Sequence, residues 1–163
     1  EQMGRLDGLG ISYAVCPGVS SFCGAAAALR AEYTLPAVSQ TVIITRMAGL
    51  TPVPERESIE SLAAHGSTMV IFLSTGMLEE LSARLISGGY SPDTPAAIVY
   101  KASWQDEKVC RCTVGTLAET ASKNDIRKTA LITGGEFLGD SYELSRLYDS
   151  GFSTEFRRAR EST

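Results

Sequence analysis

The sequence predicts an α/β fold with a mixed, mostly parallel-type sheet, one antiparallel hairpin and helices packed on the sheet. Two observations lead to this prediction. Short apolar, β-prone runs bounded by turn formers recur along the chain, at residues 41–45, 68–73, 96–100 and 129–133. Stretches with helical spacing lie between them, at residues 56–64, 77–86 and 115–122. Strands that alternate with helices in this way are typical of layered α/β domains.

The first thirty residues predict a helix, a strand and a second helix. Residues 1–10 have the composition of a helix end closed by glycine and show no helix start, so we expect the chain to begin inside a larger protein. Residues 11–16 alternate like a strand, and Pro17 and Gly18 form a turn. Ser20 or Ser21 then caps an alanine-rich helix that runs roughly to Arg30.

One pair of apolar runs predicts a hairpin. Residues 96–101 and 108–114 are separated by a connection that is too short for a helical crossover, so we expect the two strands to be antiparallel. The other apolar runs are uninterrupted, which is typical of strands covered on both faces. After Gly139, the tail over residues 142–163 is polar and becomes basic at its end.

Composition excludes several functional classes. With 44% apolar and 21% charged residues, the balance is that of a folded globular domain. The net charge is −4 and the basic residues are scattered, which argues against nucleic-acid binding. No apolar run approaches the ~20 residues that a membrane helix needs, and the N-terminus lacks the pattern of a secretory signal. We therefore expect a soluble, cytoplasmic protein without a membrane segment.

The four cysteines do not have the spacing of a metal site. Cys110 and Cys112 lie two apart in a strand-like run, whereas zinc sites usually combine Cys-x-x-Cys pairs or added histidines. His65 is the only histidine. We expect no bound metal, and buried, reduced thiols at Cys16, Cys23, Cys110 and Cys112.

Two short motifs resemble catalytic or cofactor loops but lack the required context. Gly4, Gly8 and Gly10 precede a strand, whereas a dinucleotide-binding loop follows one, so a helix end explains them better. The sequence around Ser20 resembles half of a nucleophile elbow, but Phe22 stands where the closing glycine is required. A hydrolase is therefore not predicted.

Loops that follow the strands are the expected place for a ligand, because open α/β sheets bind ligands there. Small residues are frequent in four such loops, at residues 16–22, 73–77, 100–104 and 128–131. They would let a ligand approach the backbone, but turn and helix-cap chemistry alone would also place small residues there. From spacing alone, both interpretations stay open.

Four segments, taken together, resemble the tetrapyrrole methylases. They are residues 15–22 with the alanine-rich helix that follows, residues 35–46, residues 51–57 and residues 100–107. Thr-Pro-Val-Pro-Glu at 51–55 and Ala-Ser-Trp-Gln-Asp-Glu at 102–107 resemble the branch that methylates C11 of precorrin-4 or cobalt-precorrin-4 in cobalamin biosynthesis. The resemblance covers nearly the whole chain.

The resemblance implies two α/β domains with S-adenosylmethionine between them, a tetrapyrrole substrate and a homodimer. Residues 1–36 would be the end of the first domain with the inter-domain helix, and residues 37–163 the second domain. The glycine-rich cofactor loops of the family lie before Glu1 in this comparison. We therefore expect the chain alone to carry half a site and to be inactive.

Matched position by position, the resemblance also implies the cofactor contacts. They are Ser20 and Ser21 after the Pro-Gly turn, Leu73 or Ser74 at a strand end, Ala102 facing the cofactor, and Thr129 with Ala130 near the adenine. Cys23 and Gly24 stand where the family more usually has Thr and Ala, and we expect neither change to remove a contact.

The substrate carries carboxylates, which favours nearby Arg and Lys. Arg46, Arg56 and Lys101 lie in or beside the branch-specific segments and are the candidates, although ordinary surface charge explains them equally well. No catalytic base is identified, since acidic residues in these segments also suit helix starts and turns. Trp104 suits either stacking on the macrocycle or a place at a hairpin tip or an interface.

Two alternatives remain. One is a different corrin-ring methyltransferase, acting for example at C17 or C20, and the other is a non-catalytic ligand-binding or dimerisation module. The sequence also leaves open whether the native substrate contains cobalt.

Overall fold

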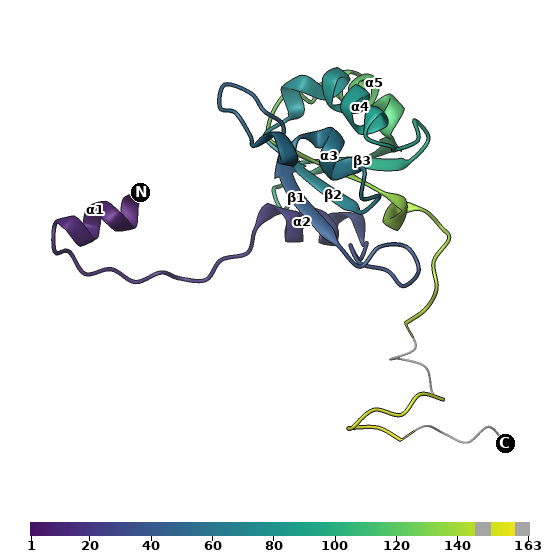
Figure 1. Ribbon diagram of the computed structural model, residues 1–163, viewed down its shortest axis with the longest axis horizontal. Helices are drawn as coiled ribbons and strands as arrows, with labels where there is room; N and C mark the ends of the chain where they lie inside the picture. Colours follow the sequence, from purple (N-terminus) through teal and green to yellow (C-terminus); the bar gives the residue numbers. More distant parts are fainter. Residues whose placement is uncertain (146–150, 159–163) are drawn as a thin grey trace.

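The computed structural model describes residues 1–145 and 151–158. It consists of one five-stranded sheet with helices on both faces (Figure 1). Helices α3 (Ile59–Ala63), α4 (Leu78–Ser87) and α5 (Leu117–Lys123) cover one face, and α2 (Ser21–Leu29) covers part of the other. This three-layer arrangement confirms the predicted α/β class.

The sheet has the strand order β1-β2-β5-β3-β4. The strands are β1 (Val42–Arg46), β2 (Thr68–Phe72), β3 (Pro95–Tyr100), β4 (Lys108–Thr113) and β5 (Ala130–Gly134). β3 and β4 form the predicted antiparallel hairpin, in which Ala96 is opposite Cys112 and Tyr100 is opposite Lys108. The mixed sheet and the hairpin are therefore confirmed.

The expectation of mostly parallel pairing is corrected. Only β1 and β2 pair in parallel, whereas β2 with β5, β5 with β3, and β3 with β4 are antiparallel. β4 runs antiparallel to β3, and after α5 the strand β5 runs in the same direction as β4. β5 lies between β2 and β3, which run parallel to each other, so both of its pairings are antiparallel.

Two apolar clusters fill the space between the sheet and its helices. The larger one lies under α3, α4 and α5, where Leu81, Leu85 and Leu117 are fully buried against Met69 and Ile98. The smaller one lies under α2. Its buried members include Ala25, Leu29, Val70, Val99 and Leu131. α4 was predicted from its apolar spacing, and it buries Leu78, Leu81 and Leu85 on the sheet side.

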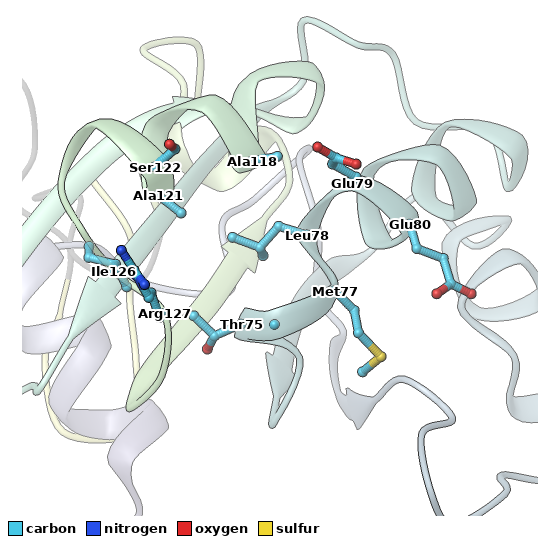
Figure 2. Close-up of a pocket in the computed structure, with 11 residues that line it drawn as sticks. Thr75, Met77, Leu78, Glu79, Glu80, Ala118, Ala121, Ser122, Ile126 and Arg127 are labelled. Atoms are coloured by element: carbon cyan, nitrogen blue, oxygen red, sulfur yellow. The ribbon is translucent and has the colours of Figure 1, made fainter.

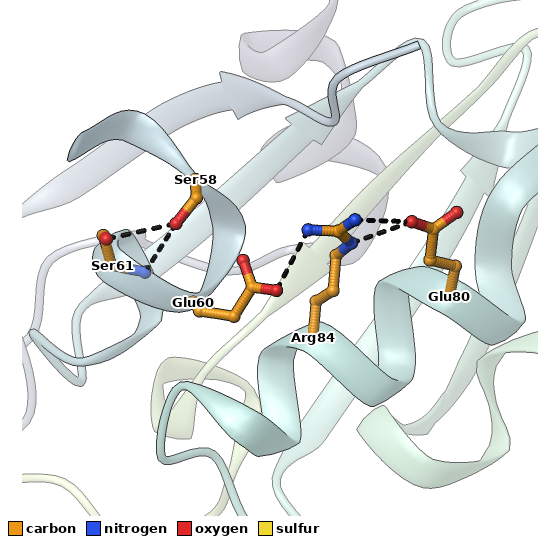
Figure 3. Close-up of polar contacts among 5 residues, drawn as sticks. All are labelled: Ser58, Glu60, Ser61, Glu80 and Arg84. Atoms are coloured by element: carbon orange, nitrogen blue, oxygen red, sulfur yellow. Dashed lines mark hydrogen bonds and ion pairs between the residues drawn. The ribbon is translucent and has the colours of Figure 1, made fainter. Parts of the chain in front are cut away.

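An ion-pair network ties α3 to α4 (Figure 3). The Arg84 guanidinium donates to Glu80 Oε1 at 2.7 Å and to Glu60 Oε1 at 3.0 Å, and it thus bridges two helices. Both pairs raise the pKa of Arg84, led by the hydrogen bond to Glu80. At the start of α3, Ser58 Oγ accepts the Ser61 backbone N–H at 3.2 Å. These contacts are partly exposed, so each contributes only modestly to stability.

The α3–α4 contact also depends on Gly88. A Cβ at this position would lie 2.6 Å from the Glu60 carbonyl oxygen and from the Ala63 Cβ. Because real Cβ atoms do not approach so closely, only glycine allows the two helices to meet here.

The segment before α2 lies apart from the sheet (Figure 1). α1 (Gln2–Gly8) ends as predicted in a glycine closure: Gly10 has a φ of 67°, and the Ile11 N–H donates to the Leu6 carbonyl at 3.0 Å. The predicted strand over residues 11–16 is wrong for this structure, where that segment is exposed and irregular. A strand needs a neighbouring strand for its backbone hydrogen bonds, and none lies beside this segment among the described residues.

Part of the predicted polar tail, residues 146–150 and 159–163, lies outside the described residues. Within the described part of the chain, no helix has the length and apolar character needed to cross a membrane.

Candidate functional site

A pocket of about 230 Å³ opens at the edge of the sheet where β2 and β3 end and β5 begins. Its wall combines apolar side chains with a few hydroxyl groups and one cation. The lining residues are Ser21, Phe72, Leu73, Thr75, Val99, Lys101, Ala102, Trp104, Thr129, Ala130 and Leu131. This edge is called the pocket edge below. Its position at strand ends is the one expected for ligands in open α/β sheets.

Six predicted site residues come together in this pocket. They are Ser21, Leu73, Lys101, Ala102, Thr129 and Ala130. Four separate segments supply them: the start of α2 and the loops that flank β2, β3 and β5. The spatial convergence of these segments is what the sequence could not show by itself.

Left-handed backbone at non-glycine residues distinguishes the pocket edge. Leu73 has a φ of 54°, Lys101 of 48° and Thr129 of 58°, and all three line the pocket. Such a conformation costs about 1 kcal/mol for a residue with a Cβ, and a β-branched residue such as Thr rarely adopts it. Strain of this kind concentrates at functional sites, so it is a second indication that this edge binds a ligand.

Hydrogen bonds between the loops hold this edge together. The Lys101 backbone N–H donates to the Thr129 carbonyl at 3.0 Å, and Thr75 Oγ1 donates to the Ala130 carbonyl at 3.2 Å. The loop after β2 and the loop after β3 are therefore both fastened to the start of β5. Buried Thr75 was not predicted as a site residue, because a single hydroxyl at the first position of a short 3-10 helix gives no distinctive sequence signal.

The β3–β4 loop forms the outer wall of the pocket. Lys101 Nζ donates to Asp106 Oδ2 at 2.5 Å and lies 5.2 Å from the centre of the Trp104 ring, in a cation–π arrangement. The Lys101 ammonium lowers the pKa of the Asp106 carboxyl, and the hydrogen bond to Asp106 raises the pKa of Lys101. The loop therefore keeps a cation beside an exposed aromatic ring at the pocket mouth.

α2 closes the pocket from the other side. A Cβ on Gly24 would lie 3.4 Å from the Ala102 Cβ, so the helix and the β3–β4 loop are in contact at this point. Ser20 is the N-cap residue of α2 and does not line the pocket, although its neighbour Ser21 does. Of the predicted pair, Ser21 therefore belongs to the pocket wall, and Ser20 lies at the N-cap position of α2.

Ser74 is fully buried, and its hydroxyl is engaged by backbone groups. Ser74 Oγ accepts the Met47 N–H at 3.1 Å and donates to the Phe72 carbonyl at 2.8 Å. These bonds join the ends of β1 and β2. Of the alternatives Leu73 and Ser74, only Leu73 presents its side chain to the pocket.

A second hollow, of about 400 Å³, lies beside the first at the ends of β1 and β2. Its lining includes Arg46, Val53, Pro54 and Glu57, and it shares Phe72 with the pocket. The branch-specific segment at residues 51–55 therefore lies next to the pocket edge, which its sequence position alone did not establish.

The two predicted arginines differ in their surroundings. The Arg46 guanidinium donates to the backbone carbonyls of Met47, Thr51 and Pro52 at 3.0 to 3.1 Å. It thereby fixes the loop after β1. The Arg56 side chain is 88% exposed and lies outside both hollows, with only a 3.9 Å ion pair to Glu57.

A larger groove of about 620 Å³ runs between the start of α4 and the end of α5 (Figure 2). Its charged side chains are largely engaged elsewhere, since Glu80 pairs with Arg84, and Arg127 pairs with Asp125 at 3.0 Å. Apart from Thr75, the groove shares no residue with the pocket, and none of the predicted cofactor residues lines it. The smaller pocket is therefore the better candidate site.

The cysteines differ in part from the prediction. All four are free, but Cys16 and Cys23 are exposed, and Cys110 and Cys112 are partly buried under α5. The expectation of four buried thiols is wrong because Cys16 belongs to the irregular segment and Cys23 lies on the outer side of α2. Burial raises the pKa of the Cys112 thiol to about 11. Among the described residues, no group of His, Cys, Asp or Glu has the arrangement of a metal site.

Comparison with known proteins gives this geometry a family context. The sequence profile of the tetrapyrrole (corrin/porphyrin) methylases matches residues 2–118. Cobalt-precorrin-4 C(11)-methyltransferase of Methanocaldococcus jannaschii is 50% identical over 98% of this chain. Precorrin-4 C(11)-methyltransferase of a Sinorhizobium species is 42% identical over 96% of the chain. The chain spans 62% of the length of each of these two relatives.

Solved structures agree with the observed fold. The X-ray structure of a cobalt-precorrin-4 methyltransferase matches 84% of this chain and 57% of that protein, with a TM-score of 0.82 and 45% identity. Uroporphyrin-III C-methyltransferase of Thermus thermophilus, complexed with S-adenosylhomocysteine, matches 85% of this chain and 57% of that protein. The second match has a TM-score of 0.67 and 20% identity, so it speaks for the fold alone.

Proposed function

The chain belongs to the tetrapyrrole (corrin/porphyrin) methylases, and from this premise we propose that it forms part of a methyltransferase acting at C11 of precorrin-4 or cobalt-precorrin-4 in cobalamin biosynthesis. The names of the relatives at 40% identity or more support this reaction. The observation that carries the proposal is the convergence of family-matched segments on one strained pocket edge.

The pocket edge would bind S-adenosylmethionine as methyl donor. Ser21, Leu73, Ala102, Thr129 and Ala130 would form the wall against it. Ser74 would act through the β1–β2 junction, and Ser20, whose side chain makes no cap hydrogen bond, would lie beside the wall at the N-cap position of α2. A mixed wall of apolar side chains, hydroxyls and nearby backbone suits a nucleoside-sized ligand. The volume of about 230 Å³ is below the ~300–1,000 Å³ of typical ligand pockets, which agrees with half a site.

The neighbouring hollow would hold the edge of the tetrapyrrole. Its position beside Phe72 would bring a macrocycle next to the methyl donor, and the apolar side chains Ile44 and Val53 would contact the ring. Arg46, Arg56 and Lys101 remain the proposed partners of the substrate carboxylates. Arg46 already donates to three carbonyls, so its first effect would be to shape this hollow, while exposed Arg56 is free to move toward a carboxylate.

The chemistry needs little from the protein besides position. The donor supplies a methyl group on a sulfonium, and transfer to a ring carbon is an in-line displacement. The pocket wall would fix the donor and exclude water, and the hydrogen-bonded loops at Leu73, Lys101 and Thr129 suit that task. No residue of the described chain is assigned as a catalytic base.

The remaining expectations stay proposals. Residues 1–36 would belong to the end of a first domain and residues 37–163 to a second, with α2 as the inter-domain helix that packs on the sheet of the second. We also propose a homodimer, a cytoplasmic location, and no activity of the chain in isolation.

One pair of variants tests which hollow binds the cofactor. Ala102→Leu would fill the pocket edge, whereas Ala118→Leu makes the same change in the groove between α4 and α5. Calorimetric titration of S-adenosylhomocysteine into the complete protein should show binding to the wild type. Ala102→Leu should weaken it by at least about tenfold, since several atoms overlap the ligand. Ala118→Leu should leave it unchanged.

The opposite pattern, with weakened binding only in Ala118→Leu, would move the site to the larger groove. Absence of binding to the wild-type protein would contradict the methyltransferase proposal itself. Mass spectrometry and NMR of the product from precorrin-4 or cobalt-precorrin-4 with a labelled methyl donor would then settle the position of methylation, and a label at C17 or C20 would replace C11 in the proposal.

A further inference from the structure

The peptide group between Ala102 and Ser103 forms part of the pocket wall and lies in an unusual conformation. Ala102 lines the pocket, and its two neighbours, Lys101 and Ser103, have φ values of 48° and 70°. Two left-handed residues that flank one small residue do not hold this arrangement by local preference, because both carry a Cβ. Something else must fix the peptide.

One carboxylate makes the direct contact. Glu107 Oε2 accepts the Ser103 backbone N–H at 2.6 Å, a short charge-assisted hydrogen bond across the loop. In a trans peptide the N–H and C=O groups point in opposite directions, and no cis peptide occurs among the described residues. Glu107 therefore fixes the direction of the Ala102 carbonyl as well as that of the Ser103 N–H.

The other loop contacts do not replace this bond. The Trp104 N–H donates to the Lys101 carbonyl at 3.0 Å, and the Glu107 N–H donates to the Trp104 carbonyl at 3.1 Å. These two turns define the path of the loop, but neither involves the Ala102–Ser103 peptide. Asp106 binds the Lys101 side chain and makes no hydrogen bond to that peptide.

We propose that Glu107 is a positioning residue that holds the Ala102–Ser103 peptide of the pocket wall in its ligand-binding orientation through the hydrogen bond to Ser103. This inference rests on the proposed function, because it assumes that the pocket binds the methyl donor. Glu107 itself lies on the outer side of the loop and is absent from the pocket lining. Its effect is to prepare the wall before the ligand arrives, which lowers the cost of binding.

Three variants of the complete protein separate this role from others. Glu107→Ala removes the acceptor, whereas Glu107→Gln keeps an oxygen that can accept the Ser103 N–H and removes only the charge. Glu119→Ala is the matched control, since it removes one exposed carboxylate, paired with Lys123, on α5. Each variant is titrated calorimetrically with S-adenosylhomocysteine, and its unfolding midpoint is measured by circular dichroism.

The expected result is an affinity about tenfold lower for Glu107→Ala, the size of one lost charge-assisted hydrogen bond, with an unchanged unfolding midpoint. Glu107→Gln should return affinity to within about threefold of the wild type, because a neutral acceptor restores most of the bond. Glu119→Ala should bind like the wild type.

Three outcomes would overturn the inference. Wild-type affinity in Glu107→Ala would show that the bond does not prepare the wall, and equal losses in Glu107→Ala and Glu107→Gln would assign the effect to charge. A loss of affinity together with a lower unfolding midpoint would assign Glu107 to hairpin stability. Failure of the wild-type protein to bind S-adenosylhomocysteine would instead refute the proposed function, and this inference with it.

Discussion

The two edges of the sheet use left-handed backbone in different ways. At the pocket edge the left-handed residues that line the pocket are Leu73, Lys101 and Thr129. At the opposite edge, where β2 and β3 begin and β5 ends, the residues with positive φ that adjoin these three strands are glycines: Gly66, Gly89 and Gly135. Glycine adopts this conformation without a steric penalty, so the opposite edge is relaxed and the pocket edge is strained.

Four other non-glycine residues also have left-handed backbone. Arg30 ends α2, Asp125 follows α5, Ala37 lies in the turn between Leu35 and Ser39, and Ser103 lies in the β3–β4 loop. Each of these residues belongs to a helix end or a tight turn, and none of them lines the pocket. The difference between the two edges is therefore consistent with the proposal that the pocket edge binds a ligand through side chains, despite their conformational cost.

The largest expected effect concerns the relaxed edge. Gly135 has a φ of 138° and a ψ of 164°, a region open almost only to glycine, and a Cβ there would lie 3.3 Å from the Thr68 Cα. Gly135→Ala should therefore lower the free energy of unfolding by about 3 kcal/mol in urea denaturation. Gly76→Ala at the pocket edge should change the free energy of unfolding by less than about 0.5 kcal/mol, because a Cβ at residue 76 would meet no neighbouring atom within 4 Å. Similar losses in both variants would remove the contrast.

A smaller effect is expected from Tyr90, also at the relaxed edge. Its hydroxyl donates to the Ser67 carbonyl in the buried connection before β2. Tyr90→Phe leaves that carbonyl without a partner and should cost about 1–2 kcal/mol in the same assay. Tyr13→Phe is the matched control, since exposed Tyr13 makes only a 3.4 Å contact with Asp7, and it should have almost no effect.

The same tyrosine gives this edge a dependence on pH. Burial raises the pKa of Tyr90 to about 12, and that of Tyr33 under α2 to about 12 as well. Between the ordinary value of about 10 and 12, the folded protein holds protons that the unfolded chain releases. Stability should thus be fully present below pH 10 and fall as the pH rises to 12. Tyr90→Phe should make this fall less steep, and an unchanged slope would argue against a buried phenol.

The smallest effect on stability is expected at the strained edge, where it comes with an effect on binding. Leu73→Gly relieves left-handed strain in the folded protein but increases the conformational entropy of the unfolded chain. The free energy of unfolding should therefore rise by about 0.5 kcal/mol. Arg30→Gly makes the same exchange at the end of α2 and should give a similar gain. Only Leu73→Gly should weaken S-adenosylhomocysteine binding in the complete protein, by about threefold from lost apolar contact. Equal binding by both variants would mean that strain at the pocket edge is unrelated to the ligand.

Local sequence patterns located the elements of the sheet well. All five strands of the sheet lie within two residues of the apolar runs that predicted them, and α4 begins one residue after its predicted start. These elements are determined by short-range periodicity and by turn formers, which a sequence displays directly. The hairpin was predictable for the same reason, from the length of its connection.

Features that depend on distant residues were not predictable in this way. The place of β5 between β2 and β3 reversed the expected balance of parallel pairs, and the segment at residues 11–16 has no neighbouring strand. The left-handed backbone at Leu73, Lys101 and Thr129 carries no glycine or asparagine as a signal. The bonds from Arg46 to three carbonyls are also invisible in sequence, because arginine on a strand end suits many partners.

The place of β5 also determines when the protein can fold during synthesis. Of the five strands described, β5 is the last to leave the ribosome, yet it lies at the centre of the sheet and joins the β1–β2 pair to the β3–β4 hairpin. Before residue 134 emerges, these two halves have no backbone hydrogen bonds to each other, and each exposes an apolar strand edge. Completion of the sheet therefore depends on long-range pairing made by β5.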